Sequence, residues 1–241
     1  MLQATRGLVF HVSRFSESAG IVKIFTEEMG LQSVIIKSLF SRNSKIRPAL
    51  FGHLVLLDLV IDLKTGRSLN YIREASLNRP FHDITDHMGK STILLFMNEM
   101  LYKSVKEEET NKPLFNFIEY SLQTLNDTQF LIHSFHLLFL VQLSEYLGFG
   151  ISQSITASGD YFDMLSGMPH EMEPSHSYYI HGDSLSLLKK LSKMEYSQLE
   201  YFDAPRAVRL DLLDKLLDFY RIHLPGMTEL KSVKILHELM S

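Results

Sequence analysis

The sequence predicts an α+β protein in which a small five-stranded β-barrel, residues 1–80, is followed by an all-α helical domain, residues 81–241. Two observations support this prediction. Short β-branched runs with alternating side chains fill the first 80 residues, whereas a helical spacing of apolar residues takes over from Asp83 onward. The hydrophobic fraction of 45% in a chain of 241 residues is sufficient for a sizeable core.

Five runs in the first 80 residues have the composition of strands. They are GLVFHVSRF at 7–15, GIVKIFTE at 20–27, LQSVIIKS at 31–38, LFGHLVLLDLVID at 50–62 and LNYIREA at 69–75. Gly20 and Gly30 stand where turns are expected. Because the edges of short strands must be protected, the five runs favour a closed or nearly closed antiparallel barrel.

Apolar residues with helical spacing follow in several longer segments. They are STILLFMNEMLYKSV at 91–105, KPLFNFIEYSLQTL at 112–125, a run that is apolar on most sides at 130–147, and DAPRAVRLDLLDKLLDFYRIHLPG at 203–226. Between Gly148 and Ser184 the pattern fails, and Gly, Ser, Pro and His dominate. We therefore expect an irregular insertion between helices at about 148–184.

The charges of the chain are distributed unevenly. Residues 1–80 contain 11 Lys and Arg against 6 Asp and Glu, whereas residues 81–241 contain 13 against 22. A basic first third joined to an acidic remainder indicates two surfaces with different partners. The chain has no cysteine, which suits a reducing cytosol, and its N-terminus has no secretory pattern, so we expect a cytoplasmic protein. The most apolar run is too short to span a membrane.

Three segments together resemble the RecO family of bacterial DNA repair and recombination mediators. They are TRGLVFHVSRFSESAGIVKIFTEEMGL at 5–31, FHLLFLVQLSEYLGF at 135–149 and LLDKLLDFYRIHLPGMTELKS at 212–232. The first carries an Arg-Gly pair, an apolar strand and a Ser-Glu turn, the second ends in Leu-Gly-Phe, and the third matches a C-terminal helix pair. The order of barrel and helices agrees as well.

The resemblance implies an oligonucleotide-binding (OB) barrel and a helical domain in a protein of DNA repair and homologous recombination. It implies binding and annealing of single-stranded DNA, with double-stranded DNA left open, and no catalytic turnover or cofactor. The implied protein partners are RecR and the C-terminal tail of the single-strand-binding protein, with loading of the recombinase RecA assisted indirectly. Such a protein is expected in the cytoplasm, associated with the nucleoid.

An OB barrel binds nucleic acid across the face of strands 2 and 3 and through the loops that join strands 1–2 and 4–5. The expected strands place most cations of the first 80 residues at these positions, and KSLFSRNSKIRP at 37–48 adds a loop with four cations and no acid. The residues that we expect to contact DNA are Arg6, Arg14, Lys23, Lys37, Arg42, Lys45, Arg47, Lys64 and Arg67. Phe15, Phe40 and Phe51 are candidates for stacking on bases, with a place in the core as the alternative for each.

The segment YRIHLPGMTELKSVK at 220–234 combines basic and apolar residues. A groove with an apolar floor and a basic rim suits a short acidic and hydrophobic peptide, and the resemblance implies such a peptide in the single-strand-binding protein. The candidate partner-binding residues are Arg221, His223, Lys231 and Lys234. Cations that simply favour a helix C-terminus are the alternative.

The insertion leaves a second class of function open. Many RecO proteins carry a four-cysteine zinc site there, whereas this chain has no cysteine. His170, His176 and His181 lie in the insertion near carboxylates, so a metal-dependent hydrolase or nuclease is the alternative, and a protein-interaction module is a third. Because zinc needs four ligands in a supported tetrahedral arrangement, which loosely spaced histidines do not indicate, we expect no metal site.

Overall fold

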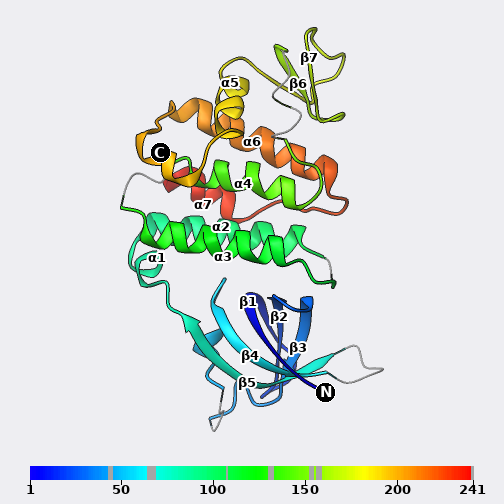
Figure 1. The fold of residues 1–241 in the computed structure, drawn as a ribbon, viewed down its shortest axis with the longest axis vertical. Coiled ribbons are helices and arrows are strands. Elements are labelled where there is room, and N and C mark those ends of the chain that lie inside the picture. The colour runs from blue at the N-terminus through cyan, green and yellow to red at the C-terminus, as the bar shows by residue number, and fades with distance from the viewer. Residues whose placement is uncertain are drawn as a thin grey trace. The chain divides into compact units, whose positions relative to one another are not determined.

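The structure is a computed structural model that describes residues 1–42, 46–63, 69–106, 108–129, 133–151, 155 and 159–239 (Figure 1). The chain forms two compact units. Unit 1 consists of Met1–Asp86 and Asn98–Gln123, and unit 2 consists of His87–Met97 and Thr124–Ser241. The expected division at residue 80 stays a prediction. The two compact units group the chain differently, because Asn98–Gln123 belong to unit 1 and His87–Met97 belong to unit 2.

Unit 1 contains the predicted five-stranded barrel. Its strands are β1 (Leu2–Arg14), β2 (Gly20–Thr26), β3 (Gly30–Ile36), β4 (Leu56–Asp62) and β5 (Asn70–Arg79). They close in the order β1-β2-β3-β5-β4, with β4 pairing back to β1. The β3–β5 pairing is parallel and the others are antiparallel. This is the closed OB barrel that the resemblance implied.

Alternating residues of the strands fill the barrel. Val22 and Ile24 of β2 face inward together with residues of the other four strands. The structure explains the glycine of the Arg-Gly pair. A Cβ on Gly7 would lie 2.5 Å from Ile24 Cγ2 and 2.7 Å from Leu59 Cδ1, which is too close. Glycine at this position therefore allows β1 to approach the core closely.

The fourth predicted strand is shorter than its apolar run. We expected one run over residues 50–62, whereas β4 begins at Leu56 and a 3-10 helix, η1 (Pro48–Phe51), precedes it. Leu54 has a positive φ of 53°, which interrupts an extended chain. Phe51 and Leu54 are nevertheless buried, so the run is apolar throughout without being a strand throughout.

Helices cover one outer face of the barrel within unit 1. They are α1 (His82–Asp86), the Asn98–Ser104 part of α2 (Met88–Ser104) and the Lys112–Gln123 part of α3 (Lys112–Asp127). Phe115 of α3 lies 6.1 Å from Phe25 of β2, and Phe25 lies 5.8 Å from Phe10 of β1, between ring centroids. The middle of β1 is therefore buried on both faces, which explains its nearly continuous apolar run.

Unit 2 is mainly helical around α4. Its remaining elements are α4 (Phe135–Tyr146), α5 (Gly182–Leu191), η2 (Tyr196–Tyr201), α6 (Arg206–His223) and α7 (Ser232–Leu239). The α4 helix is buried on most sides, as predicted. The Tyr220 hydroxyl of α6 donates to the Leu140 carbonyl at 2.6 Å, and the Phe135 and Tyr196 rings stack at 4.6 Å. None of the described helices is long and apolar enough to cross a membrane.

The insertion is more regular than the sequence indicates. It contains a three-stranded antiparallel sheet of β6 (Tyr161–Asp163), β7 (Met168–His170) and β8 (Tyr179–His181), in the order β7-β6-β8. Strands of three residues are too short to show an alternating pattern. The predicted α+β class is confirmed, but unit 2 is not purely helical.

Candidate nucleic-acid interface

The register of the barrel brings the ends of several strands together. Arg14 at the end of β1 pairs with Gly20, and Gly20 pairs on its other side with Ile36 at the end of β3. The start of β5 pairs in parallel with the same end of β3. Lys37 directly follows Ile36, so Arg14 and Lys37 lie at one end of the barrel. We call residues 14–19 and 37–42 the basic end.

Two segments of the basic end are hydrogen-bonded to each other. The Phe40 amide donates to the Ser18 carbonyl at 2.9 Å, and the Ser18 hydroxyl donates to the Lys37 carbonyl at 3.3 Å. The loop between β1 and β2 and the segment after β3 therefore form one continuous surface. The amino-acid sequence alone does not show that these two segments are in contact.

The three candidate phenylalanines differ in exposure. Phe15 in the β1–β2 loop is 60% exposed, whereas Phe51 is 7% exposed and belongs to the barrel core. Phe40 is partly buried and packs against that core. Phe15 is therefore the one member of this trio with its ring open for stacking on a base, and Phe51 has the core position that was its alternative.

Lys23 lies on the outer face of β2, opposite His11 of β1. Tyr102 of α2 lies beside both, with its ring centroid 5.2 Å from Lys23 Nζ and 5.0 Å from the His11 ring centroid. Burial lowers the pKa of His11, and the neighbouring His53 and Lys23 lower it further. The lowered pKa means that His11 carries less positive charge near neutral pH than an ordinary histidine.

Arg42 and Arg47 are exposed on either side of residues 43–45. Lys45, Lys64 and Arg67, which we also expect to contact DNA, lie outside the described residues. The segment that contains Lys64 and Arg67 links β4 to β5. Their roles stay predictions.

The described cations that we expect to contact DNA, apart from Arg6, share one electrostatic property. Arg14, Lys23, Lys37, Arg42 and Arg47 form no ion pair with any described carboxylate. Their positive charge is therefore available to an anion.

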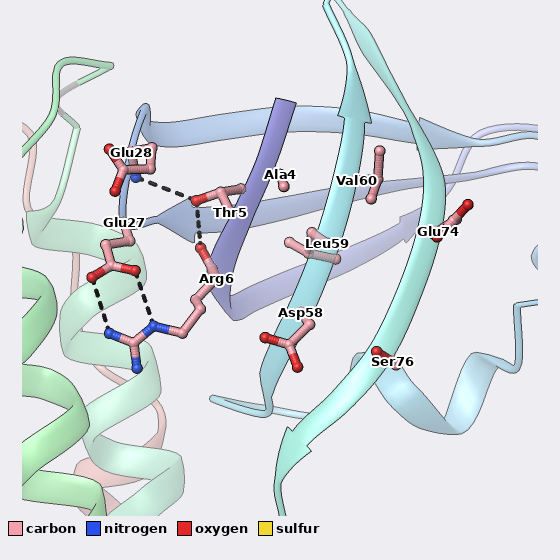
Figure 2. Close-up of a pocket in the computed structure, with 10 residues that line it drawn as sticks. All are labelled: Ala4, Thr5, Arg6, Glu27, Glu28, Asp58, Leu59, Val60, Glu74 and Ser76. Atoms are coloured by element: carbon pink, nitrogen blue, oxygen red, sulfur yellow. Dashed lines mark hydrogen bonds and ion pairs between the residues drawn. The ribbon is translucent and has the colours of Figure 1, made fainter. Parts of the chain in front are cut away.

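Arg6 is in a different environment, at the other end of β2. Its guanidinium donates to Glu27 at 2.9 and 3.0 Å, as Figure 2 shows, and to both carboxylate oxygens of Glu119 at 2.8 Å. It also lies 5.2 Å over the Phe115 ring. The hydrogen bond to Glu27 is the main cause that raises the pKa of Arg6. This arginine joins β1 to the β2–β3 turn and to α3. Because two carboxylates compensate its positive charge, little of that charge is available to an external anion.

The surface around Arg6 is acidic. An open pocket of about 420 Å³ lies over the outer face of β1, β4 and β5 (Figure 2). Its lining contains four carboxylates, which we call the acidic face: Glu27, Glu28, Asp58 and Glu74. Lys112 pairs with Glu28 at 2.7 Å. With Arg6 engaged by carboxylates, this face repels a phosphate backbone.

The histidines of the insertion do not converge on one point. His170 Nε2 and His176 Nε2 lie 3.7 and 3.3 Å from the Asp163 carboxylate, whereas His181 packs near the Tyr161 ring. In the described part of the chain, no group of three or more His, Cys, Asp or Glu residues has the geometry to hold a metal ion.

Protein donors already serve the Asp163 carboxylate. The Leu165 amide and the Ser166 hydroxyl each donate to it at 2.8 Å. Burial by itself raises the pKa of Asp163, but these hydrogen bonds and the nearby His176 outweigh burial and lower it. Asp163 is thus an ionised hub of the three-stranded sheet.

A groove of about 550 Å³ lies between α6 and α7 within unit 2. Leu217, Leu230 and Val233 give it apolar walls, and Arg221 and Lys234 line it as predicted. Arg221 pairs with Asp218 at 2.6 Å. The lining also contains Asp214, Asp218, Glu229 and Glu238, so its charge is mixed rather than basic.

The other two candidate partner-binding residues are not part of the groove lining. His223 Nε2 bonds the Met164 carbonyl at 2.9 Å, and its ring stacks on Phe149 at 5.4 Å. Lys231 is exposed next to the groove residue Leu230. The four residues of the prediction therefore occupy at least two environments.

A closed OB barrel with cations at its strand ends that pair with no described carboxylate defines a candidate nucleic-acid-binding protein. Comparison with known proteins makes the class more specific. Residues 1–81 match the family described as Recombination protein O N terminal, and residues 87–233 match the family described as Recombination protein O C terminal.

Full-length relatives agree with these matches. The chain is similar to proteins named DNA repair protein RecO from three bacteria. These are Bacteroides fragilis (35% identical over 240 residues, 99% of each chain), Phocaeicola vulgatus (33% over 241 residues, 100% of each) and Flavobacterium johnsoniae (35% over 240 residues, 98% of each). The chain belongs to the RecO family of DNA repair proteins, which confirms the resemblance seen in the sequence.

Proposed function

We propose that this protein binds and anneals single-stranded DNA during repair and homologous recombination, and that the basic end, together with Lys23 of β2, holds the strand. The observation that supports this proposal is that Arg14 and Lys37 lie at one end of the barrel, and that neither they nor Lys23, Arg42 and Arg47 pair with a described carboxylate. Arg6 is left out of the proposed surface, because Glu27 and Glu119 engage it.

Counterion release is the physical basis of such binding. Each phosphate of a single strand that a cation neutralises contributes about −0.7 to the slope of log K against log salt. If about four cations engage, the slope is about −3. Because the chain shows no base-reading motif, the binding is expected to tolerate any sequence. The exposed Phe15 can add stacking on a base.

The first prediction concerns the loop between β3 and η1. Replacement of Arg42, Lys45 and Arg47 by Ala together should weaken binding of a fluorescent oligonucleotide and reduce the magnitude of the salt slope by up to about 2. The unfolding midpoint should stay near that of the wild type, because exposed cations contribute little to stability.

A variant with Lys190 and Lys193, exposed cations of unit 2, replaced by Ala is the matched control and should keep the wild-type slope. An unchanged slope in the triple variant would show that this loop does not contact DNA. Failure of the wild type to bind at low salt would leave the protein-interaction module as the better function.

We further propose that the α6–α7 groove receives the acidic C-terminal tail of the single-strand-binding protein, and that RecR is a second partner in assisting RecA. The support is the apolar lining of the groove together with Arg221 and Lys234. The four carboxylates of the groove make apolar contact, rather than net charge, the expected main contribution.

The second prediction tests this groove with a synthetic acidic and hydrophobic tail peptide. Val233→Asp should weaken peptide binding about tenfold, because it removes an apolar side chain from the groove lining and adds a like charge, whereas DNA binding should stay unchanged. Fluorescence anisotropy with labelled peptide measures the effect. Peptide binding that is equal in the variant and the wild type would place the tail elsewhere.

We propose that no catalytic turnover accompanies these activities, and that DNA binding associates the protein with the nucleoid in the cytoplasm. The hydrolase or nuclease alternative rested on the histidines of the insertion, two of which face an Asp163 carboxylate already bonded by Leu165 and Ser166. Cleavage of an oligonucleotide by purified protein with added manganese would overturn the non-catalytic part of the proposal.

A further inference from the structure

Three cations of the proposed DNA surface each lie over an aromatic ring. Arg14 Cζ is 4.9 Å from the centroid of Phe40, Lys23 Nζ is 5.2 Å from Tyr102, and Lys37 Nζ is 5.0 Å from Tyr71. All three distances are within the range of about 6 Å in which the face of a ring attracts a cation.

The rings come from three different elements, each fixed by the fold of unit 1. Phe40 packs against the barrel core, Tyr71 is paired in the ladders of β5, and Tyr102 belongs to α2. All three are partly buried. The aromatic partner is therefore held by packing, whereas the cation belongs to a long side chain with many rotamers.

A ring restrains a cation without neutralising it. A carboxylate also restrains a cation, as Glu27 and Glu119 restrain Arg6, but it cancels the charge that a phosphate would meet. No described carboxylate pairs with Arg14, Lys23 or Lys37. These three cations are thus ordered and still fully charged.

We propose that Phe40, Tyr71 and Tyr102 are positioning residues for DNA binding, an inference that rests on the proposed function. They hold Arg14, Lys37 and Lys23 in place before the strand arrives. Because an immobilised side chain loses less conformational freedom on binding, a preorganised cation binds a phosphate more tightly than a mobile one.

A competing role for the same rings is direct stacking on bases. In that case the cation would leave the ring as the base arrives, and the contribution of the ring would depend on the base. Positioning and stacking therefore predict different responses to a strand that has phosphates but no bases.

The third prediction uses Tyr71→Leu and Tyr102→Leu, with Tyr71→Phe and Tyr102→Phe as matched controls that keep the ring. Each Leu variant should bind single-stranded DNA about two- to fivefold more weakly at fixed salt, because one cation loses its restraint. The salt slope should stay at its wild-type value, since the cations still meet the phosphates. Each Phe variant should bind like the wild type.

Lys37→Ala is the contrasting variant and should change the slope by about 0.7. The affinity loss of the Leu variants should persist with an oligonucleotide of abasic residues. A loss that disappears on the abasic strand would show stacking and overturn positioning.

Unchanged or tighter binding by both Leu variants would likewise overturn the inference. Absence of binding by the wild type would instead overturn the proposed function itself. Denaturation by urea checks that the variants are folded, and the Phe variants keep the comparison valid if a Leu variant is destabilised.

Discussion

Arg6 and Arg14 lie on the same strand of the barrel, yet their surroundings are opposite in kind. Arg6 bonds Glu27 and Glu119 at the acidic face, whereas Arg14 lies over Phe40 at the basic end and pairs with no carboxylate among the described residues. One arginine is part of the internal bonding of unit 1. The other keeps its charge for an external anion.

The comparison shows that the sign of a residue's charge does not by itself determine its role in this barrel. Both arginines lie over an aromatic ring, Arg6 over Phe115 and Arg14 over Phe40. What differs is the presence of carboxylates, which neutralise the first and not the second. We propose that a cation of this barrel contributes to DNA binding where no carboxylate pairs with it.

The largest expected effect that tests this comparison is on stability. Arg6→Met removes hydrogen bonds to two partly buried carboxylates, whose side chains are 23% and 20% exposed, and leaves those charges without a partner. We expect unfolding in urea to become easier by about 2–3 kcal/mol. The affinity of the folded variant for single-stranded DNA should change less than about twofold.

Arg14→Met is the matched control and should behave in the reverse way. Its stability should change by less than about 0.5 kcal/mol, because the side chain is exposed and pairs with no described carboxylate, whereas the magnitude of its salt slope should fall by about 0.7. If Arg6→Met weakened DNA binding more than Arg14→Met did, the division between an acidic face and a basic end would be wrong.

Much of the fold could be predicted from the sequence. The β-branched runs predicted five strands, and the ladders of the structure confirm that five strands close into a barrel. The segment that mixes basic and apolar residues lies partly along a groove, which Arg221 and Lys234 line, and its role as a binding site stays a prediction. These features depend on local pattern and on a known topology.

The partners of each cation could not be predicted in the same way. Glu119 is 113 positions from Arg6, and Tyr102 lies on a helix far from Lys23 in the sequence. No local signal distinguishes Arg6 from Arg14, since Arg6 directly precedes the predicted strand at 7–15 and Arg14 stands near its end. The four carboxylates of the α6–α7 groove come from α6 before Arg221 and from the loop and α7 after it.

The smallest expected effect is on the pH dependence of stability, which should differ between variants at Arg6 and at Arg14. The hydrogen bond from Arg6 is the main cause that lowers the pKa of Glu27 below its ordinary value of 4.5, and it outweighs the opposing effect of burial. Because the folded state then binds fewer protons than the unfolded state, this carboxylate stabilises the fold above about pH 4.5, and the contribution is lost as the pH falls through the lowered value.

Wild type and Arg14→Met should therefore lose stability in parallel between about pH 5 and pH 3. Arg6→Met should lose less over the same interval, since Glu27 no longer has its partner. Urea midpoints measured across this interval test the expectation, and curves of equal slope for all three proteins would mean that the Arg6–Glu27 bond contributes nothing to folding.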